Sequence, residues 1–126
     1  MHFDQRTLTA DWKECITACF RCTQICEECS DDMIGMDPMG DPRLMERCIR
    51  LCRECADVCA MAGQWMSRLS PLAERMCSFC ADVCDQCAEA CEQYAPHHAL
   101  CGLCAQECRR CAETCRGMSK RSAKAA

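Results

Sequence analysis

The sequence lacks the features that would place a protein in or across a membrane. No apolar run approaches the roughly 20 residues that a transmembrane helix needs. The first residues, Met1 to Arg6, form neither a basic region followed by an apolar region nor a twin-arginine pair, so no export signal is predicted. We therefore expect a cytoplasmic protein without a membrane partner, and thiols in the cytosol stay reduced rather than paired in disulfides.

The sequence also lacks the motifs of common enzyme classes. It contains no serine–histidine–acid arrangement, no phosphate-binding loop and no signature of paired carboxylates, so it does not predict an enzyme. The formal net charge is only −4, and acidic and basic residues are interspersed along the chain. Such a pattern is typical of an ordinary soluble surface and argues against a nucleic-acid partner.

Cysteine is the residue that the sequence has in excess, with 19 among 126 residues. The cysteines fall into four blocks: Cys15, Cys19, Cys22, Cys26 and Cys29; Cys48, Cys52, Cys55 and Cys59; Cys77, Cys80, Cys84, Cys87 and Cys91; and Cys101, Cys104, Cys108, Cys111 and Cys115. Within each block, steps of three and four residues alternate strictly. This is the a/d spacing of a heptad, which predicts that each block forms one stripe along one helix.

The breaks between the blocks predict an all-α fold. Proline follows a capping residue at Asp41-Pro42 and at Ser70-Pro71, Pro96 precedes the fourth block, and Gly117 suits the end of the last helix. We expect one domain over residues 1–126, an antiparallel up-down-up-down four-helix bundle with a cysteine-lined core. The predicted helices span residues 9–36, 42–67, 71–95 and 96–117, and residues 118–126 are expected to form a flexible tail.

A core of cysteine is unusual as mere packing. Cysteine is small and buries readily, yet leucine or isoleucine would fill the same space with more apolar area and better-defined rotamers. The stripes are therefore better explained as metal ligands. Larger apolar residues flank the stripes, and we expect them to seal the gaps between helices or to contact another copy: Ile16, Phe20, Ile49, Val58, Phe79, Val83 and Leu103.

The chemistry of thiolates favours Cu(I) as the bound metal. Thiolates select soft or borderline ions, chiefly Cu(I), Zn(II) and iron–sulfur clusters. If each Cu(I) takes two sulfurs and each sulfur bridges two ions, one copper replaces one thiol proton and the buried core stays close to neutral. Zinc in tetrahedral thiolate sites leaves negative charge in the core, and iron–sulfur ligation typically includes a Cys-Pro step that is absent here. Two alternatives stay open: an iron–sulfur (ferredoxin-like) electron-transfer protein, and a zinc or general metal buffer.

Methionine and histidine continue the cysteine stripes at one predicted end of the bundle. Thioether and imidazole offer weaker and more exchangeable ligands than thiolate, which suits a port for metal. We expect His97, His98 and Met45 to be metal ligands there. The neighbouring methionines suit a port and an apolar plug equally, because methionine is a common gap filler: Met33 and Met36.

The opposite end of the bundle is expected to be closed. Met66 and Met118 extend their stripes at this end, and Leu8 and Trp12 lie close to them along the predicted helices. These side chains predict an apolar plug.

The repeated Cys-x-x-Cys-x-x-x-Cys runs, such as Cys77-Ser78-Phe79-Cys80-Ala81-Asp82-Val83-Cys84, resemble those of the bacterial copper storage proteins. Four consecutive blocks in one register make the resemblance specific, and it covers about residues 8–118. It implies a store of many Cu(I) ions inside the bundle, a homotetramer and, without an export signal, the cytosolic branch of the family. Copper is expected to arrive from a chaperone or a small thiol and to leave the helicity of the chain little changed.

Overall fold

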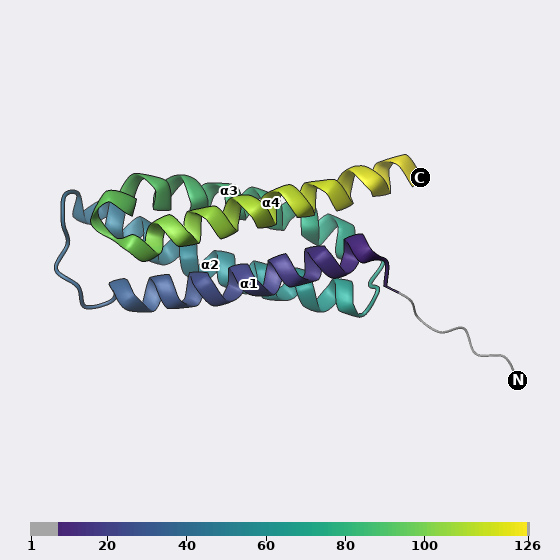
Figure 1. Ribbon diagram of the computed structural model, residues 1–126, viewed down its shortest axis with the longest axis horizontal. Helices are drawn as coiled ribbons and strands as arrows, with labels where there is room; N and C mark the ends of the chain where they lie inside the picture. Colours follow the sequence, from purple (N-terminus) through teal and green to yellow (C-terminus); the bar gives the residue numbers. More distant parts are fainter. Residues whose placement is uncertain (1–7, 126) are drawn as a thin grey trace, which may run out of the picture.

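The chain folds into four α-helices that run up and down in sequence order (Figure 1). The computed structural model describes residues 8–125, with side chains described as far as Met118. The helices are α1 (Ala10–Met33), α2 (Pro42–Ser67), α3 (Ala73–Tyr94) and α4 (Ala99–Ala125), and a short 3₁₀ helix, η1 (Ala95–His97), joins the last two. Each helix packs against two neighbours, in the order α1, α2, α3, α4 and back to α1. The predicted all-α antiparallel bundle is confirmed.

The two ends of the bundle differ in their connections. The α1–α2 loop and η1 lie at one end, on the left in Figure 1, and the short α2–α3 connection lies at the other, near the start of α1. We call them the loop end (residues 33–45 and 94–101) and the turn end (residues 8–15, 66–77 and 115–118). This arrangement brings the methionine and histidine residues of the predicted port to one end.

Local sequence explains where two of the helices begin. Thr9 Oγ1 accepts a hydrogen bond from the N–H three residues later at 3.2 Å, so Thr9 is the N-cap of α1. Asp41 Oδ1 accepts one from the N–H two residues later at 2.9 Å and caps α2. Pro42 follows in the first turn, where its missing N–H leaves no hydrogen bond unmade. The start of α2 therefore agrees with the predicted residue.

Three other helix ends differ from the prediction by two or three residues. The first helix ends at Met33 rather than at residue 36, because Gly35 adopts a φ of 88°, a backbone conformation that suits glycine. The third helix begins at Ala73 rather than at residue 71, after a turn in which Ser70 Oγ accepts a hydrogen bond from a backbone N–H at 3.1 Å. The fourth begins at Ala99 rather than at residue 96, because His98 is extended, with φ −154° and ψ 109°.

The end of the chain is also more helical than predicted. Helix α4 continues through Gly117 to Ala125, where a helix end and a flexible tail were expected, and residue 126 lies outside the described residues. No proline follows Gly117, and the lysine, arginine and alanine residues beyond it are good helix formers. One glycine costs a helix only about 1 kcal/mol relative to alanine, which these residues can offset.

The interior of the bundle consists mainly of cysteine. All nineteen cysteines are buried free thiols with exposed fractions of 0% or 1%. Alanines beside the stripes, such as Ala56, Ala81 and Ala112, are buried as well, and their small side chains let neighbouring helices approach closely. The heptad spacing therefore turns every cysteine toward the bundle axis, and the predicted cysteine-lined core is present.

The apolar residues that flank the stripes divide into two groups. Four are half-buried against the cysteine core: Ile16, Ile49, Val58 and Val83. The other three are exposed rather than sealed between helices: Phe20, Phe79 and Leu103. The Phe20 ring still packs closely against Gly63 of α2. A Cβ atom at this position would lie 2.8 Å from Cζ of the ring, so the absence of a side chain on Gly63 makes room for it.

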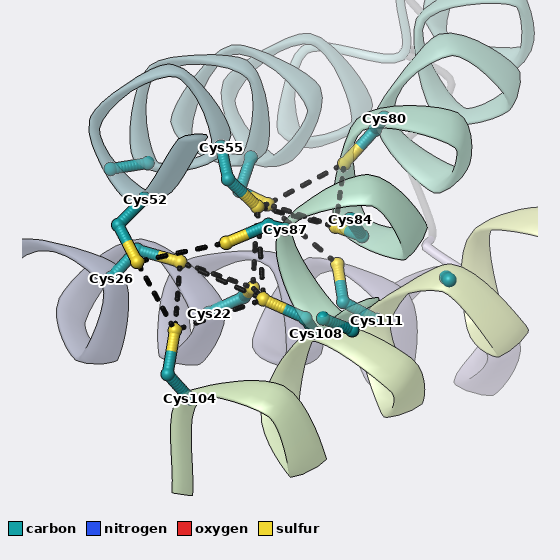
Figure 2. Packing of buried hydrophobic residues seen from close by; sticks show 14 of the residues in the cluster. Cys22, Cys26, Cys52, Cys55, Cys80, Cys84, Cys87, Cys104, Cys108 and Cys111 are labelled. Carbon is teal, nitrogen blue, oxygen red and sulfur yellow. Dashed lines mark hydrogen bonds between the residues drawn. The ribbon is translucent and has the colours of Figure 1, made fainter. Parts of the chain in front are cut away.

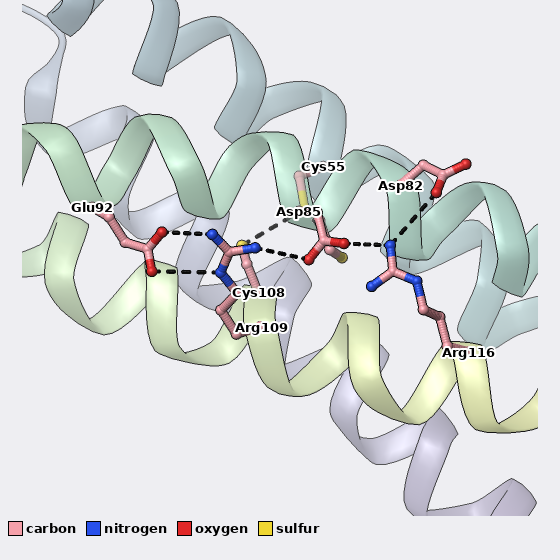
Figure 3. A network of polar contacts seen from close by, with 8 residues as sticks. Cys55, Asp82, Asp85, Glu92, Cys108, Arg109 and Arg116 are labelled. Carbon is pink, nitrogen blue, oxygen red and sulfur yellow. Dashed lines mark hydrogen bonds and ion pairs between the residues drawn. The ribbon is translucent and has the colours of Figure 1, made fainter.

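The outer face of the bundle is charged, and on α3 and α4 the charges form a chain of ion pairs (Figure 3). Arg109 contacts Asp85 at 3.0 Å and Glu92 at 2.7 Å, and Arg116 pairs with Asp85 and, at 3.6 Å, with Asp82. These side chains are partly exposed, so solvent screening limits their contribution to stability. None of the described helices is long and apolar enough to cross a membrane.

Candidate metal centre

The sulfur atoms of the four stripes form a column along the bundle axis, as Figure 2 shows for its middle part. Neighbouring Sγ atoms lie as close as 3.5 Å, between Cys59 and Cys84, and most of these contacts join different helices. Cys22 of α1, for example, lies 3.6 Å from Cys108 of α4. Because every turn of a helix with a cysteine stripe adds a sulfur to the axis, thiols of three or four helices meet in each group along the column.

Groups of four thiols that could hold a metal ion overlap one another along the column. In each group the sulfur atoms all lie within 4.8 Å of one another. Several cysteines belong to two of these groups, and so join one group to the next: Cys22, Cys26, Cys55, Cys104 and Cys108. A column with shared sulfurs suits ions that accept bridging thiolates, because no ion needs four sulfurs of its own.

Proton sharing limits the charge that the column carries without metal. Hydrogen bonding by Cys101 lowers the pKa of the Cys29 thiol to about 5, and the same contact raises the pKa of Cys101. Deeper in the column, contacts with Cys104 and Cys108, together with burial, raise the pKa of Cys26. A thiolate at one position is therefore stabilised by the thiols around it, which stay protonated. Monovalent cations that replace those protons would leave the net charge of the core almost unchanged.

A mixed set of donor atoms closes the column at the loop end. His98 is only 8% exposed, and its Nδ1 atom lies 3.1 Å from Cys101 Sγ and 3.9 Å from Cys29 Sγ. The two sulfurs lie 3.6 Å apart, and Met33 Sδ is 3.8 Å from Cys101 Sγ. Two thiols, one imidazole nitrogen and one thioether thus converge. We call this set the mixed cluster (Cys29, Met33, His98 and Cys101).

The other two non-cysteine ligands predicted at this end lie apart from those contacts. His97 is exposed, its ring centroid is 5.5 Å from that of Tyr94, and a Cβ atom on Gly40 would lie 3.0 Å from its Nε2 atom. His97 therefore packs against the α1–α2 loop rather than into the column. Met45 is buried in the first turn of α2 and belongs to the core. A hydrogen bond of 3.2 Å from Met39 N–H to the Tyr94 hydroxyl also fixes the loop.

One residue of this end was missed by the sequence analysis. Asp32, in the last turn of α1, places Oδ2 2.7 Å from His98 Nε2. Its position directly before Met33, which continues the first stripe, was the available signal. An aspartate is otherwise ordinary on a charged helix face, so the sequence alone did not single it out.

The turn end of the column is covered by apolar side chains. Met66 is fully buried and Met118 is 7% exposed, and Trp12 packs half-buried against the core. Below them, Cys15 and Cys19 each lie 3.7 Å from Cys115 through their sulfur atoms. The burial of these residues agrees with the predicted plug.

Comparison with known proteins places this architecture in a family. The sequence profile of the family described as "Copper storage protein" matches residues 8–120. The "Uncharacterized cysteine-rich protein YhjQ" of Bacillus subtilis (strain 168) is 38% identical over 84 residues, which are 67% of this chain and 75% of that protein.

Solved structures with the same fold agree with the sequence match. The "Cu(I)-bound Copper Storage Protein BsCsp3" is 37% identical, with a TM-score of 0.77, over 86% of this chain and 98% of the other. A cytosolic copper storage protein from Streptomyces lividans, described with five coppers, is 30% identical, with a TM-score of 0.78, over 87% of this chain and 92% of the other. The chain, with its four stripes of buried thiols, belongs to the copper storage protein family.

Proposed function

We propose that this protein stores and sequesters many Cu(I) ions within its four-helix bundle, and that storage rather than catalysis is its role. The observation that carries the proposal is the column of nineteen buried thiols whose sulfur atoms are shared between neighbouring groups of four. All nineteen cysteines are the proposed ligands. Membership of the copper storage protein family, and a relative of this fold described as Cu(I)-bound, support copper as the cargo.

Filling proceeds by exchange of ligands along the column. Copper reaches the mixed cluster at the loop end, where imidazole and thioether bind it less tightly than thiolate alone. It then passes inward between sulfur atoms that lie less than 4 Å apart, such as Cys52 and Cys91 at 3.6 Å. Each step replaces one thiolate by the next, so no ion has to leave the sulfur environment and become exposed to water or oxidant. Met45 and His97 stay predicted ligands at this end.

Charge balance favours Cu(I) over the two alternatives. At one copper per thiol, each Cu⁺ replaces one proton and the buried column gains no net charge. A Zn²⁺ ion held by four thiolates would leave two negative charges at each buried site. An iron–sulfur cluster takes four cysteines of its own, whereas the groups here share theirs, as Cys108 does.

The cellular context is proposed from the relatives and the surface. A relative described as a cytosolic copper storage protein supports a cytosolic location for this chain. A homotetramer is proposed because large apolar side chains remain exposed on the outer face, such as Phe79 at 55% and Leu103 at 52%. A copper chaperone or a small thiol is the proposed donor, since free Cu(I) would bind other thiols before it reached the port.

Counting the copper ions tests the storage proposal. Fully reduced protein without metal is titrated anaerobically with Cu(I) against a chromophoric chelator that competes for the ion. Bridging thiolates at one ion per sulfur predict about 15 to 20 tightly held ions per chain. A plateau at about four ions or fewer would contradict storage, because discrete sites in that number suit zinc or a cluster.

A further inference from the structure

The carboxylate of Asp32 determines which nitrogen of His98 is free to bind metal. Asp32 Oδ2 lies 2.7 Å from His98 Nε2, whereas the opposite nitrogen, Nδ1, faces Cys101 at 3.1 Å. An ionised carboxylate can only accept a hydrogen bond, so in the neutral imidazole Nε2 carries the proton. The lone pair of the ring is then on Nδ1, directed at the sulfur atoms of the mixed cluster.

The place of Asp32 in α1 points to a role other than helix stability. Asp31 and Asp32 occupy the last turn of the helix, and no basic residue accompanies them there. Negative charge at this end is unfavourable, because the helix dipole already places partial negative charge on the terminal carbonyl groups. A sequence that breaks a local rule in this way often does so at a functional site.

The backbone around Asp32 holds the carboxylate in place. Ile34 N–H donates to the carbonyl groups of Ser30 and Asp31, both at 3.2 Å, and closes the helix end. The Asp32 side chain is 56% exposed, whereas that of His98 is only 6% exposed. The carboxylate thus covers the buried ring from the solvent side, in the way that a carboxylate commonly orients a histidine that ligates metal.

We propose that Asp32 is a positioning residue for copper uptake: it fixes the Nε2–H tautomer and the orientation of His98, so that Nδ1 and the mixed cluster form the first docking site for Cu(I). The inference rests on the proposed storage function and adds a named residue to its first step. When Cu(I) binds Cys101 and His98 Nδ1, the thiol proton of Cys101 leaves to solvent or to the thiolate of the donor. The oxidation state of copper does not change.

Two measurements on the same variants test the role of Asp32. In reduced protein without metal, ¹⁵N NMR reports which nitrogen of His98 is protonated, independently of any copper function. Rapid mixing with a Cu(I)–chelator complex at substoichiometric copper gives the rate of the first transfer. Asp32→Ala should lose the fixed Nε2–H tautomer and slow this transfer about 10- to 100-fold, the usual cost of removing such a partner of a metal ligand. The neighbouring variant Asp31→Ala is the matched control and should resemble the wild type in both.

A third variant separates positioning from simple attraction of the cation. Asp32→Asn removes the charge but can still accept the Nε2 proton, so its tautomer in the spectrum should predict its rate. A variant that keeps the tautomer yet loads slowly, or loses the tautomer yet loads at the normal rate, would overturn the proposal. In a His98→Ala background, Asp32→Ala should cause no further slowing, and an additive effect would also overturn it.

The same titration separates failure of this inference from failure of the storage function. Copper capacity at saturation should stay within about one ion of the wild-type value in Asp32→Ala, because the thiolates of the column are intact. A high capacity with unchanged kinetics in Asp32→Ala would reject the role of Asp32 alone. A low capacity in the wild type would reject storage whatever the NMR spectrum showed.

Discussion

Replacement of Cys108 by alanine should lower the copper capacity by about one to two ions. Cys108 Sγ has four sulfur neighbours, at 3.6, 3.8, 3.9 and 3.9 Å, from Cys22, Cys26, Cys55 and Cys104. It also belongs to two of the overlapping groups of thiols. If each sulfur bridges about two ions, its removal deprives both of one ligand, and a neighbouring thiolate can take over one of them.

The fold should survive the loss of Cys108. The substitution removes one sulfur atom from a fully buried position, which is comparable in size to a buried methylene group. The expected decrease in the free energy of unfolding is about 1 kcal/mol, from lost burial and a small cavity. Circular dichroism and urea unfolding of the protein without metal check that the variant keeps its helices.

Anaerobic Cu(I) titration with native mass spectrometry measures the change in capacity. Arg110→Ala, on the exposed face of α4, is the matched control and should bind as many ions as the wild type. A capacity of Cys108→Ala equal to that of the wild type would refute the bridging role. A loss of about four ions or more would instead indicate closed clusters that assemble as units, and would refute the shared column.

Three further predictions concern the ion pairs on the surface, the pH dependence of copper binding and the helicity of the chain on loading. Arg109→Ala should lower the free energy of unfolding by about 0.5 to 1 kcal/mol, because its ion pairs are partly exposed, and a loss of several kcal/mol in urea unfolding would contradict this reading. Copper affinity should fall as the pH falls, because protons compete for thiolates. Hydrogen bonding lowers the pKa of Cys29 to about 5, so protons compete with copper for this thiolate only below about pH 5. The pKa of Cys26 is raised, so at neutral pH this thiol releases a proton when copper binds. Chelator competition repeated between about pH 5 and pH 8 should therefore show a copper affinity that rises with pH, and an affinity independent of pH would refute this reading. Loading should leave the far-ultraviolet circular dichroism almost unchanged, because the helices are formed beforehand, and a marked gain of helicity would contradict a preformed bundle.

Much of the bundle could be predicted from the sequence because its interior uses one residue type. Alternating steps of three and four residues leave only one helical face for the cysteines, so the direction of every stripe follows. The start of α2 could be predicted because Asp41 and Pro42 act within a single turn. The start of α4 could not, since His98 is extended at a point where its ring contacts Asp32, 66 residues away in the sequence.

The details of the port could not be predicted because they depend on contacts between distant segments. His97 and His98 are adjacent and chemically identical, and tertiary packing sets one ring against Gly40 and the other against Asp32. Asp32 lies 66 residues from its histidine partner. In the sequence it is one of many acidic residues on outer helix faces, and its role depends on how α1 ends beside η1.

Anomalous diffraction at the copper edge from crystals loaded anaerobically with Cu(I) tests the central claim most directly. Storage inside the bundle predicts a row of copper peaks along the bundle axis, each between cysteine sulfur atoms of neighbouring helices, with sulfurs such as Cys108 contacting two ions. It also predicts a peak at the mixed cluster, bound by His98 Nδ1. A few isolated peaks on the outer surface, with the sulfur column empty, would contradict storage inside the bundle.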